Sequence, residues 1–298
     1  MKPAPFTHHA PTSIAEAVSL LAELEDAKVL AGGQSLVPVL NMRLAAPSHL
    51  VDINQVRELD RIEVDADRVR VGAIVRHAEL EHDERAHEAI PLLRQALQWV
   101  AHPAIRNRGT TVGSIVHADP SGEMPAVLAL TEGTVRALST RGERAITAED
   151  FFLGPMESSL AGDELAIGVD FPRFPTGAIT GYDELARRSG DYALAGVAVA
   201  LVPLPDGTAT ARASFVSVTE RPDVLDLTPA LAGRPIGEIG PDELAAVARA
   251  ARDHVNPVDD IHASADYRRH LSGTLCRRVL STLLSRATTT QPMEAGQR

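Results

Sequence analysis

The sequence contains a single cysteine, Cys276, among its 298 residues. One cysteine cannot form a disulfide within the chain, and it cannot supply the ligands of a cysteine-bound iron–sulfur cluster or a structural zinc site. No His-Glu-x-x-His or other paired metal-ligand spacing occurs, so we expect no metal bound by this chain. Cys276 lies on an apolar helical stripe and is interpreted as a packing residue.

Aromatic residues and long apolar runs are also scarce. Aromatic side chains make up only 3% of the sequence, so aliphatic residues must form most of the core. No run of about 18 apolar residues occurs, which predicts no transmembrane segment. The N-terminus lacks the apolar core of a secretory signal, and with the single cysteine this favours a reduced, cytoplasmic location.

Positive charge is in deficit, because 29 Lys and Arg residues face 40 Asp and Glu residues, for a formal net charge of −11. Nucleic acid and anionic membranes bind proteins through clustered Lys and Arg side chains, so we expect neither as a partner. The hydrophobic content of 44% is typical of a soluble globular protein. The length is sufficient for more than one domain.

Residues 1 to about 60 have the pattern of a compact α/β unit. Ser13 and Glu16 have capping-box spacing ahead of apolar residues at helical intervals. A short apolar run then stops at Gly32-Gly33, as a strand that enters a tight turn does. The predicted elements are a helix after Ser13, a strand at 28–31, a helix at 36–44 and a strand at 49–53.

Residues 61–175 predict a second α/β layer, which ends where Pro172, Pro175 and Gly177 cluster. Its predicted elements are a strand at 68–75, a helix at 88–101, a polar loop at 103–119, and strands at 134–138 and 164–171. Beyond this boundary the pattern changes to an antiparallel meander followed by helices. Those elements are strands at 182–187, 193–202 and 209–218, a helix at 241–254 that begins with Pro241, and a helix at 264–285.

Two segments have the residue types that bind a phosphate-containing ligand. The first reads Leu30-Ala31-Gly32-Gly33-Gln34-Ser35-Leu36. Its glycines allow close backbone approach, and a strand–turn–helix start directs several N–H groups at one point, which suits a pyrophosphate. It matches neither the Rossmann fingerprint nor the P-loop, and an ordinary glycine turn is the alternative.

The second segment is a long polar stretch between apolar elements, and loops of that length inside a domain are often functional. It runs from Ile105 to Pro120 and contains Thr110, Thr111, Val112, Gly113, Ser114, His117 and Asp119. Its hydroxyl groups can surround a phosphate or a ribose, and a solvated connection is the alternative. No nucleophile-elbow motif accompanies His117 and Asp119, so we expect no catalytic triad and no catalytic residue in this chain.

Together, the two segments resemble the two flavin loops of the medium subunits of the carbon monoxide dehydrogenase and xanthine dehydrogenase family. Further matches follow in the same order, and the resemblance covers roughly residues 3 to 285. These matches are Asn41-Met42-Arg43-Leu44, Leu50-Val51-Asp52-Ile53, Phe151-Phe152-Leu153-Gly154, Asp163-Glu164-Leu165 and Gly190-Asp191-Tyr192-Ala193.

The resemblance implies an α+β fold with two domains. Residues 1–175 would be a two-lobed FAD-binding domain of the vanillyl-alcohol-oxidase (PCMH) type, with lobes at about 1–60 and 61–175. Residues 178–286 would form a C-terminal domain with a three-stranded antiparallel sheet and a helical bundle. Residues 287–298 would be a disordered tail.

The resemblance also assigns positions around the FAD. Ala31 to Leu36, next to Leu30, would hold the pyrophosphate through backbone N–H groups, including those of Gly32, Gly33, Gln34 and Ser35. The second side of the dinucleotide would be held by the segment that contains Thr110, Thr111, Val112, Gly113, Ser114, His117 and Asp119. Glu123 occupies the position of an acidic FAD ligand, Leu165 would pack by the isoalloxazine, and Arg187 and Tyr192 would lie near its rim.

Three positions depart from the family pattern. Val112 replaces a glycine, and Ser114 replaces a longer Asn or Asp. Asp183-Glu184 occupy a stretch in which the family often has a lysine. Loss of a positive charge near the flavin would disfavour its anionic reduced form, so the potential and the acceptor are left open.

The implied function is that of an FAD-binding electron-transfer subunit of a molybdenum hydroxylase. A large molybdopterin subunit would oxidise the substrate, a small [2Fe-2S] subunit would pass electrons on, and the FAD would deliver them to an external acceptor, in a dimer of heterotrimers. The substrate is left open among an N-heterocycle, an aldehyde and carbon monoxide, with a slight preference for the first. The alternatives are a stand-alone FAD oxidase of the same fold and a non-enzymatic scaffold subunit.

Overall fold

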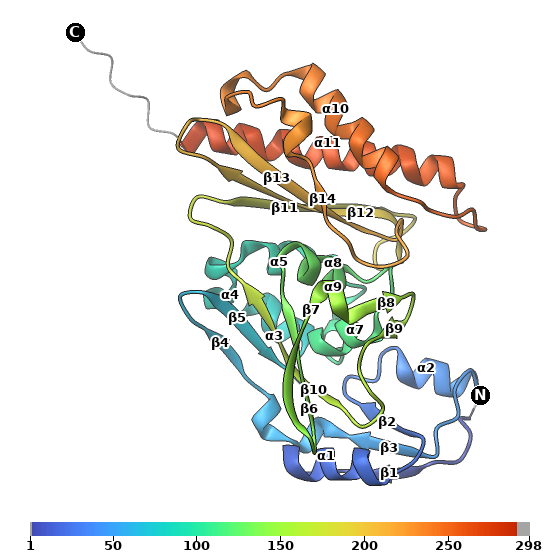
Figure 1. Cartoon of the computed structure of the whole chain (residues 1–298). Coiled ribbons are helices and arrows are strands. Elements are labelled where there is room, and N and C mark those ends of the chain that lie inside the picture. The colour runs from blue at the N-terminus through green and yellow to red at the C-terminus, as the bar shows by residue number, and fades with distance from the viewer. Residues whose placement is uncertain (1, 291–298) are drawn as a thin grey trace.

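A small parallel sheet lies at one end of the molecule, with its strands in the order β1-β3-β2 (Figure 1). The computed structural model describes residues 2–290. Because β2 and β3 run parallel, the chain leaves both strands at the same edge of the sheet, so Ala31 meets Asn54 there. The elements of this part are β1 (Thr7–His9), α1 (Ile14–Glu23), β2 (Ala27–Leu30), α2 (Leu36–Asn41), β3 (His49–Asp52) and the 3₁₀ turns η1 (Ile53–Gln55) and η2 (Arg57–Leu59).

Helix α1 begins where the capping pattern predicts. The Ser13 hydroxyl accepts a hydrogen bond from the Glu16 N–H at 3.2 Å. The Glu16 carboxylate accepts the N–H of Thr12 at 2.8 Å, so the reciprocal bond reaches one residue further back than in a standard capping box. The buried residues Ala17, Val18 and Leu21 then place one face of α1 on the core.

A five-stranded antiparallel sheet follows, in the order β4-β5-β10-β6-β7. Its strand β10 returns late in the sequence and lies at the centre, which ties residues 165–172 to the strands that precede them. The strands of this part are β4 (Ile62–Val64), β5 (Arg68–Gly72), β6 (Thr134–Ser139), β7 (Gly142–Thr147), β8 (Phe152–Gly154), β9 (Glu157–Ser158) and β10 (Leu165–Pro172).

Two predictions for the helices of this part are wrong. The single helix predicted at 88–101 is divided, because Pro91 lacks an N–H and clashes with a preceding helical turn, so it starts a new helix. The loop predicted at 103–119 contains two short helices, since the Thr110 side chain acts as a helix cap. The helices are α3 (His77–His82), α4 (Glu84–Ala89), α5 (Pro91–Leu97), α6 (Pro103–Arg106), α7 (Thr111–His117), α8 (Glu123–Leu130) and α9 (Ala148–Phe151).

The C-terminal part is an antiparallel sheet in the order β11-β12-β13-β14, covered on one side by two helices (Figure 1). The three predicted strands are present, and a two-residue strand adds a fourth, which is too short to give a periodic signal. The elements are β11 (Ile179–Ala186), β12 (Ala193–Pro203), β13 (Ala209–Val216), β14 (Leu225–Asp226), η3 (Thr228–Leu231), η4 (Ile236–Glu238), α10 (Pro241–His254) and α11 (Ala265–Thr290).

The predicted disordered tail begins too early in the sequence. Helix α11 continues to Thr290, and Ala287 is buried in the core between the helices and the sheet. The remainder of the predicted tail, 291–298, lies outside the described residues.

Strand β12 separates two hydrophobic cores. Val197, Val199 and Leu201 face α10 and α11, whereas Ala198 and Ala200 belong to the core that is shared with the N-terminal half. Successive residues of a strand point to opposite faces, so a strand with both faces covered must be apolar throughout. Helices α5 and α8 pack against the second face of this sheet. The predicted α+β architecture is therefore confirmed, with the C-terminal sheet lying on one helix before and one helix after the second predicted ligand segment.

Candidate functional site

The two predicted ligand segments meet at Gly32. A side chain at this position would place its Cβ 2.5 Å from the Arg108 carbonyl oxygen, 2.7 Å from the Gly109 Cα and 3.0 Å from the Thr110 nitrogen. No side chain fits at these distances, so glycine is required here by space. Segments that lie far apart in the sequence are thus in direct backbone contact.

The first segment exposes a row of amide groups beside this contact. Within the described part of the chain, the N–H groups of Gly32, Gly33, Gln34 and Ser35 donate no hydrogen bond. Gly33 has a φ of 70°, which favours glycine and turns the backbone so that successive N–H groups converge. The Gln34 side chain supports the turn by donating to the Gly32 carbonyl at 3.0 Å.

A cavity of about 410 Å³ opens over this row of amides. It is lined by the first segment, by Val37 and Pro38 of α2, by Asp52 and Asn54, and by Arg108 from the second segment. Arg108 is exposed and is the one cationic residue among those that line the cavity, which also include the polar residues Gln34 and Asn54 and the acidic Asp52. Converging N–H groups beside an arginine form a suitable binding site for an anionic group such as a diphosphate.

Asn54 and Arg76 hold the two segments in register. The Asn54 amide donates to the Ala31 carbonyl at 2.9 Å, and its oxygen accepts from the Arg76 guanidinium at 2.6 Å. Arg76 also donates to the Arg108 carbonyl at 2.9 Å. One chain of hydrogen bonds therefore runs from the first segment to the second.

The second segment is fixed from within the core. Thr110 Oγ1 accepts the Gly113 N–H at 3.0 Å and so caps α7, and a Cβ at Gly113 would meet that oxygen at 2.5 Å. The buried imidazole of His77 shares a hydrogen bond with the Thr111 hydroxyl at 3.1 Å, and the backbone N–H of His77 donates to the Gly109 carbonyl at 2.9 Å. Burial, and then the positive charge of Arg106, lower the pKa of His77 to about 4, so it is neutral at pH 7.

The turn between α7 and α8 connects this segment to the C-terminal sheet. Ala118 adopts a left-handed conformation, with a φ of 54°, and Asp119 then accepts the Ser121 N–H at 2.9 Å. The Pro120 carbonyl accepts the N–H of Ser217, which follows β13, at 2.9 Å. The end of the second segment is thereby anchored to the neighbouring layer.

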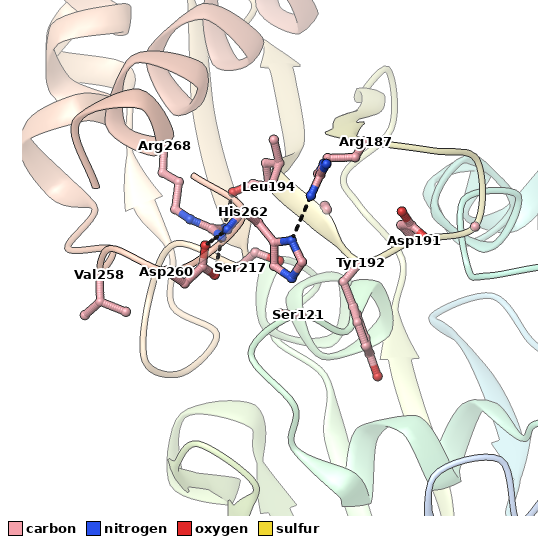
Figure 2. A pocket seen from close by; sticks show the side chains of 12 residues that line it. Ser121, Arg187, Asp191, Tyr192, Leu194, Ser217, Val258, Asp260, His262 and Arg268 are labelled. Carbon is pink, nitrogen blue, oxygen red and sulfur yellow. Dashed lines mark hydrogen bonds and ion pairs between the residues drawn. The ribbon is translucent and has the colours of Figure 1, made fainter. Parts of the chain in front are cut away.

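Tyr192 lies between this turn and a second cavity of about 600 Å³. Figure 2 shows its ring directed away from Arg187 and His262, which point toward each other from two different loops. The pKa of Tyr192 is raised by partial burial of the side chain and then by the charges of Asp119 and Glu123. Arg187 donates to His262 Nδ1 at 3.2 Å, so it faces this second cavity and not the one over the first segment.

The other predicted site residues lie at varying depth. Val112 is 2% exposed and packs in the core, which explains how a β-branched residue fits there. Leu165 is buried at the start of β10, and Ser114 and His117 are half-buried on α7. Cys276 is buried, and burial raises the pKa of its thiol to about 12, so this cysteine is unreactive at neutral pH, in agreement with the predicted packing role.

Sequence reasoning missed four residues that organise the site, namely Asn54, Arg76, His77 and the side chain of Arg108. The side chains of Asn54 and Arg76 bind to backbone carbonyls, and such contacts leave no motif. Arg108 had a usable signal, because a cation directly before a glycine turn is suited to a phosphate ligand.

Models of two protein families match almost the whole chain. The one described as "FAD binding domain in molybdopterin dehydrogenase" matches residues 4–174, and "CO dehydrogenase flavoprotein C-terminal domain" matches residues 180–283. The chain belongs to the family of FAD-binding subunits of molybdopterin dehydrogenases. The resemblance seen in the two loops is confirmed.

Relatives of this flavoprotein match over their full length. The nicotine 6-hydroxylase medium subunit of Paenarthrobacter nicotinovorans is 42% identical over 286 residues, which are 94% of this chain and 98% of that one. The carbon monoxide dehydrogenase medium chain of Hydrogenophaga pseudoflava is 34% identical and covers 96% and 99%. The crystal structure of quinoline 2-oxidoreductase from Pseudomonas putida 86 matches with a TM-score of 0.89 and 36% identity, over 96% of this chain and 99% of that one.

The described part of this flavoprotein contains no helix that is long and apolar enough to span a membrane. Its relatives are subunits of dehydrogenase and hydroxylase complexes, so the predicted oxidoreductase class is confirmed.

Proposed function

We propose that this flavoprotein holds FAD across its two loop segments and passes electrons from iron–sulfur clusters of a partner subunit to an external acceptor. The observation that supports this most directly is the contact at Gly32, where free amides of one segment meet the backbone of the other. The residues fit an FAD diphosphate, because the cavity there has converging N–H donors and the Arg108 guanidinium.

In this proposal the backbone from Ala31 to Leu36 binds the pyrophosphate, next to Leu30. The second side of the dinucleotide contacts the segment that includes Thr110, Thr111, Val112, Gly113, Ser114, His117 and Asp119. Glu123 and Leu165 lie further along the FAD, and Tyr192 and Arg187 lie toward its ring end. These residues bind and orient the FAD, and none of them needs to act as an acid or base on the organic substrate.

When bound, FAD supplies the ability to accept electrons singly or in pairs. The protein contributes position and electrostatics. The neutral His77 holds the second segment without adding a charge, and Arg76 joins both segments through backbone carbonyls. The site is therefore held open as a preformed groove, which lowers the ordering cost of binding a long cofactor.

We further propose the wider assembly that the family resemblance implies. The chain would join a large molybdopterin subunit and a small [2Fe-2S] subunit in a cytoplasmic dimer of heterotrimers. Residues 1–175 would be the FAD-binding domain, with lobes at about 1–60 and 61–175, and residues 178–286 the C-terminal domain. An N-heterocycle is the favoured substrate of the complex, since nicotine and quinoline, in the names of two relatives, both contain a ring nitrogen.

The test is to purify the complex with this chain at native stoichiometry, separate the subunits, and record their visible spectra. We expect flavin absorbance with this chain, iron–sulfur absorbance with the small subunit, and bleaching of the flavin when an N-heterocycle is added to the intact complex. Turnover of an organic donor by this chain alone would instead favour a stand-alone oxidase. A complex that is active while this chain is colourless and takes up no FAD would make the chain a scaffold.

A further inference from the structure

A group of buried acids lies where the C-terminal sheet meets the turn after the second segment. Glu184 of β11 is only 5% exposed. Its neighbour Tyr182 belongs to the core shared with the N-terminal half, whereas Asp183 pairs with Arg278 of α11 on the opposite face. Alternate residues of a strand share a face, so Glu184 points with Tyr182 toward the N-terminal half.

The backbone leaves room for this carboxyl group. Tyr182 donates its hydroxyl to Glu184 Oε2 at 2.7 Å. Gly196 lies opposite Glu184 on β12, and a Cβ there would meet both the Glu184 Cβ and the Tyr182 hydroxyl at 3.1 Å. A glycine in the middle of a strand costs stability, so its presence indicates that the Tyr182–Glu184 pair needs this space.

Glu123 approaches the same place from the other side, at the first position of α8, which packs on β12 and β13. Glu123 is half-buried, with its carboxyl group enclosed by protein. Within the described residues, neither Glu123 nor Glu184 has a cation within ion-pair distance. The positive group that lowers the pKa of Glu123 is Arg106, which is itself paired with Glu81.

When two enclosed carboxyl groups have no neighbouring cation, ionising both has a large free-energy cost. Burial raises the pKa of Glu184 to about 7, as does the charge of Asp183, against the hydrogen bond from Tyr182. Burial and then the charge of Glu184 raise the pKa of Glu123 to about 8, with Asp119 adding to this and Arg106 opposing it. The pair therefore exchanges a proton in the neutral range, and the two pKa values belong to the pair.

We propose that Glu184, acting with Glu123 and Tyr182, is a proton-accepting group coupled to reduction of the FAD. This inference rests on the proposed function, which places Glu123, Asp119 and Tyr192 along the cofactor. A bound FAD would supply a ring that can take up two electrons and one proton for each electron pair from the partner clusters. A second proton from bulk water binds a carboxylate oxygen of Glu184, so the enclosed site gains no net charge and no bond of the protein breaks.

The physical reason is electroneutrality. A negative charge added to an enclosed region that already contains carboxylates is strongly opposed unless a proton accompanies it. In a site with a lysine at this place the ammonium group would balance the reduced ring, whereas here the balance must come from proton uptake. Glu184 thus accepts and holds the second proton. Its effect is on the pH dependence of the flavin potential.

The experiment compares the intact complex containing the wild-type chain, Glu184→Gln or Asp183→Asn. Flavin absorbance is followed in potentiometric titrations from pH 6 to 9, and the slope of the midpoint potential against pH counts protons per electron pair. We expect two protons per electron pair near pH 8 in the wild type and in Asp183→Asn, and one in Glu184→Gln, with the difference vanishing near pH 6. Asp183 is the matched control because it is adjacent but faces α11. Removing its charge lowers the pKa of Glu184, so Glu184 is still ionised at pH 8 before reduction and can still take up the second proton.

Equal slopes in all three proteins, each with full FAD content, would overturn the inference while leaving the proposed function intact. A wild-type complex in which this chain holds no FAD would overturn the proposed function first. Because FAD content is measured separately for each variant, loss of folding in Glu184→Gln is distinguished from loss of proton coupling. If that variant loses its FAD, Glu184→Ser in the same titration replaces it and carries the same expectation.

Discussion

The two ligand segments meet at the same cavity, but they differ in how deeply they are buried and in what holds them in place. The first, from Ala31 to Ser35, is half-exposed along its length and is held by a few hydrogen bonds to its backbone. The second has Thr110 and Thr111 at 2% and 0% exposure, and His77 secures it from inside the core. One segment is therefore positioned from the surface, and the other is built into the fold.

This difference separates two kinds of contribution to binding. Residues that fix the second segment also stabilise the protein, because unpaired buried polar groups cost free energy in every state of ligation. Residues that fix the first segment mainly reduce the ordering cost of binding. Variants in the second segment should thus change both the stability and the FAD affinity, whereas variants in the first segment should change mainly the FAD affinity.

The largest expected effect comes from the point where the segments touch. Gly32→Val places carbon atoms against the backbone of Arg108 and Gly109, which cannot move away because the core holds it. We expect FAD content of the purified complex to fall to below roughly a tenth of the wild-type value, since closing the loops over the cofactor becomes impossible. Gly162→Val is the control, because a Cβ there meets nothing within 4 Å. Normal FAD content in Gly32→Val would show that the two segments do not close on one ligand.

A second test concerns the second segment, which His77 holds from inside the core. The pKa of His77 is lowered in the folded chain to about 4 from an ordinary 6.5, so the unfolded chain binds a proton that the folded one resists. The stabilising contribution of neutral His77 is therefore fully present above pH 6.5 and falls as pH drops toward 4, by on the order of 3 kcal/mol over that range. Chemical denaturation at several pH values should show that the unfolding free energy of the wild type, relative to that of His77→Asn, decreases by this amount between pH 6.5 and 4. Parallel profiles for both proteins would mean that His77 is not the titrating group.

The smallest expected effect concerns the exposed segment. Asn54→Ala removes the hydrogen bond to the Ala31 carbonyl and the acceptor for Arg76. At about 1 kcal/mol of net effect, the Kd for FAD should rise by roughly five- to tenfold, with little change in unfolding free energy. The matched control is Asn107→Ala, whose exposed side chain makes no hydrogen bond within the described part of the chain. A large loss of stability with unchanged FAD affinity would reverse the assignment of the two segments.

Much of the fold and the identity of both segments could be predicted from the sequence, because they depend on local patterns. Apolar periodicity located α1, α10 and most of the longer strands, and consecutive glycines located the first segment. The second segment was found as a polar stretch, but its helix was missed. Its small and β-branched residues give no helical periodicity, and the cap at Thr110 is visible only when the side chain is placed.

What the sequence could not supply was the set of contacts between distant residues. Helix α8 was missed because it is buried on all sides, so it has no polar face to produce a period. Arg187 was expected at the flavin rim, yet it hydrogen-bonds to His262, which lies on a loop of the C-terminal part. Its place in the bound state therefore stays a prediction. The Glu184 cluster likewise depends on a strand and a helix that meet only in the fold.

The two-faced strand β12 has a mechanical consequence. Its alanines at 198 and 200 allow the helices beneath to pack closely, while its valines on the other side hold α11, so one strand is shared by two cores. The halves of the molecule cannot swing apart as hinged domains do, because opening that seam would expose the shared core between the sheet and helices α5 and α8 to water.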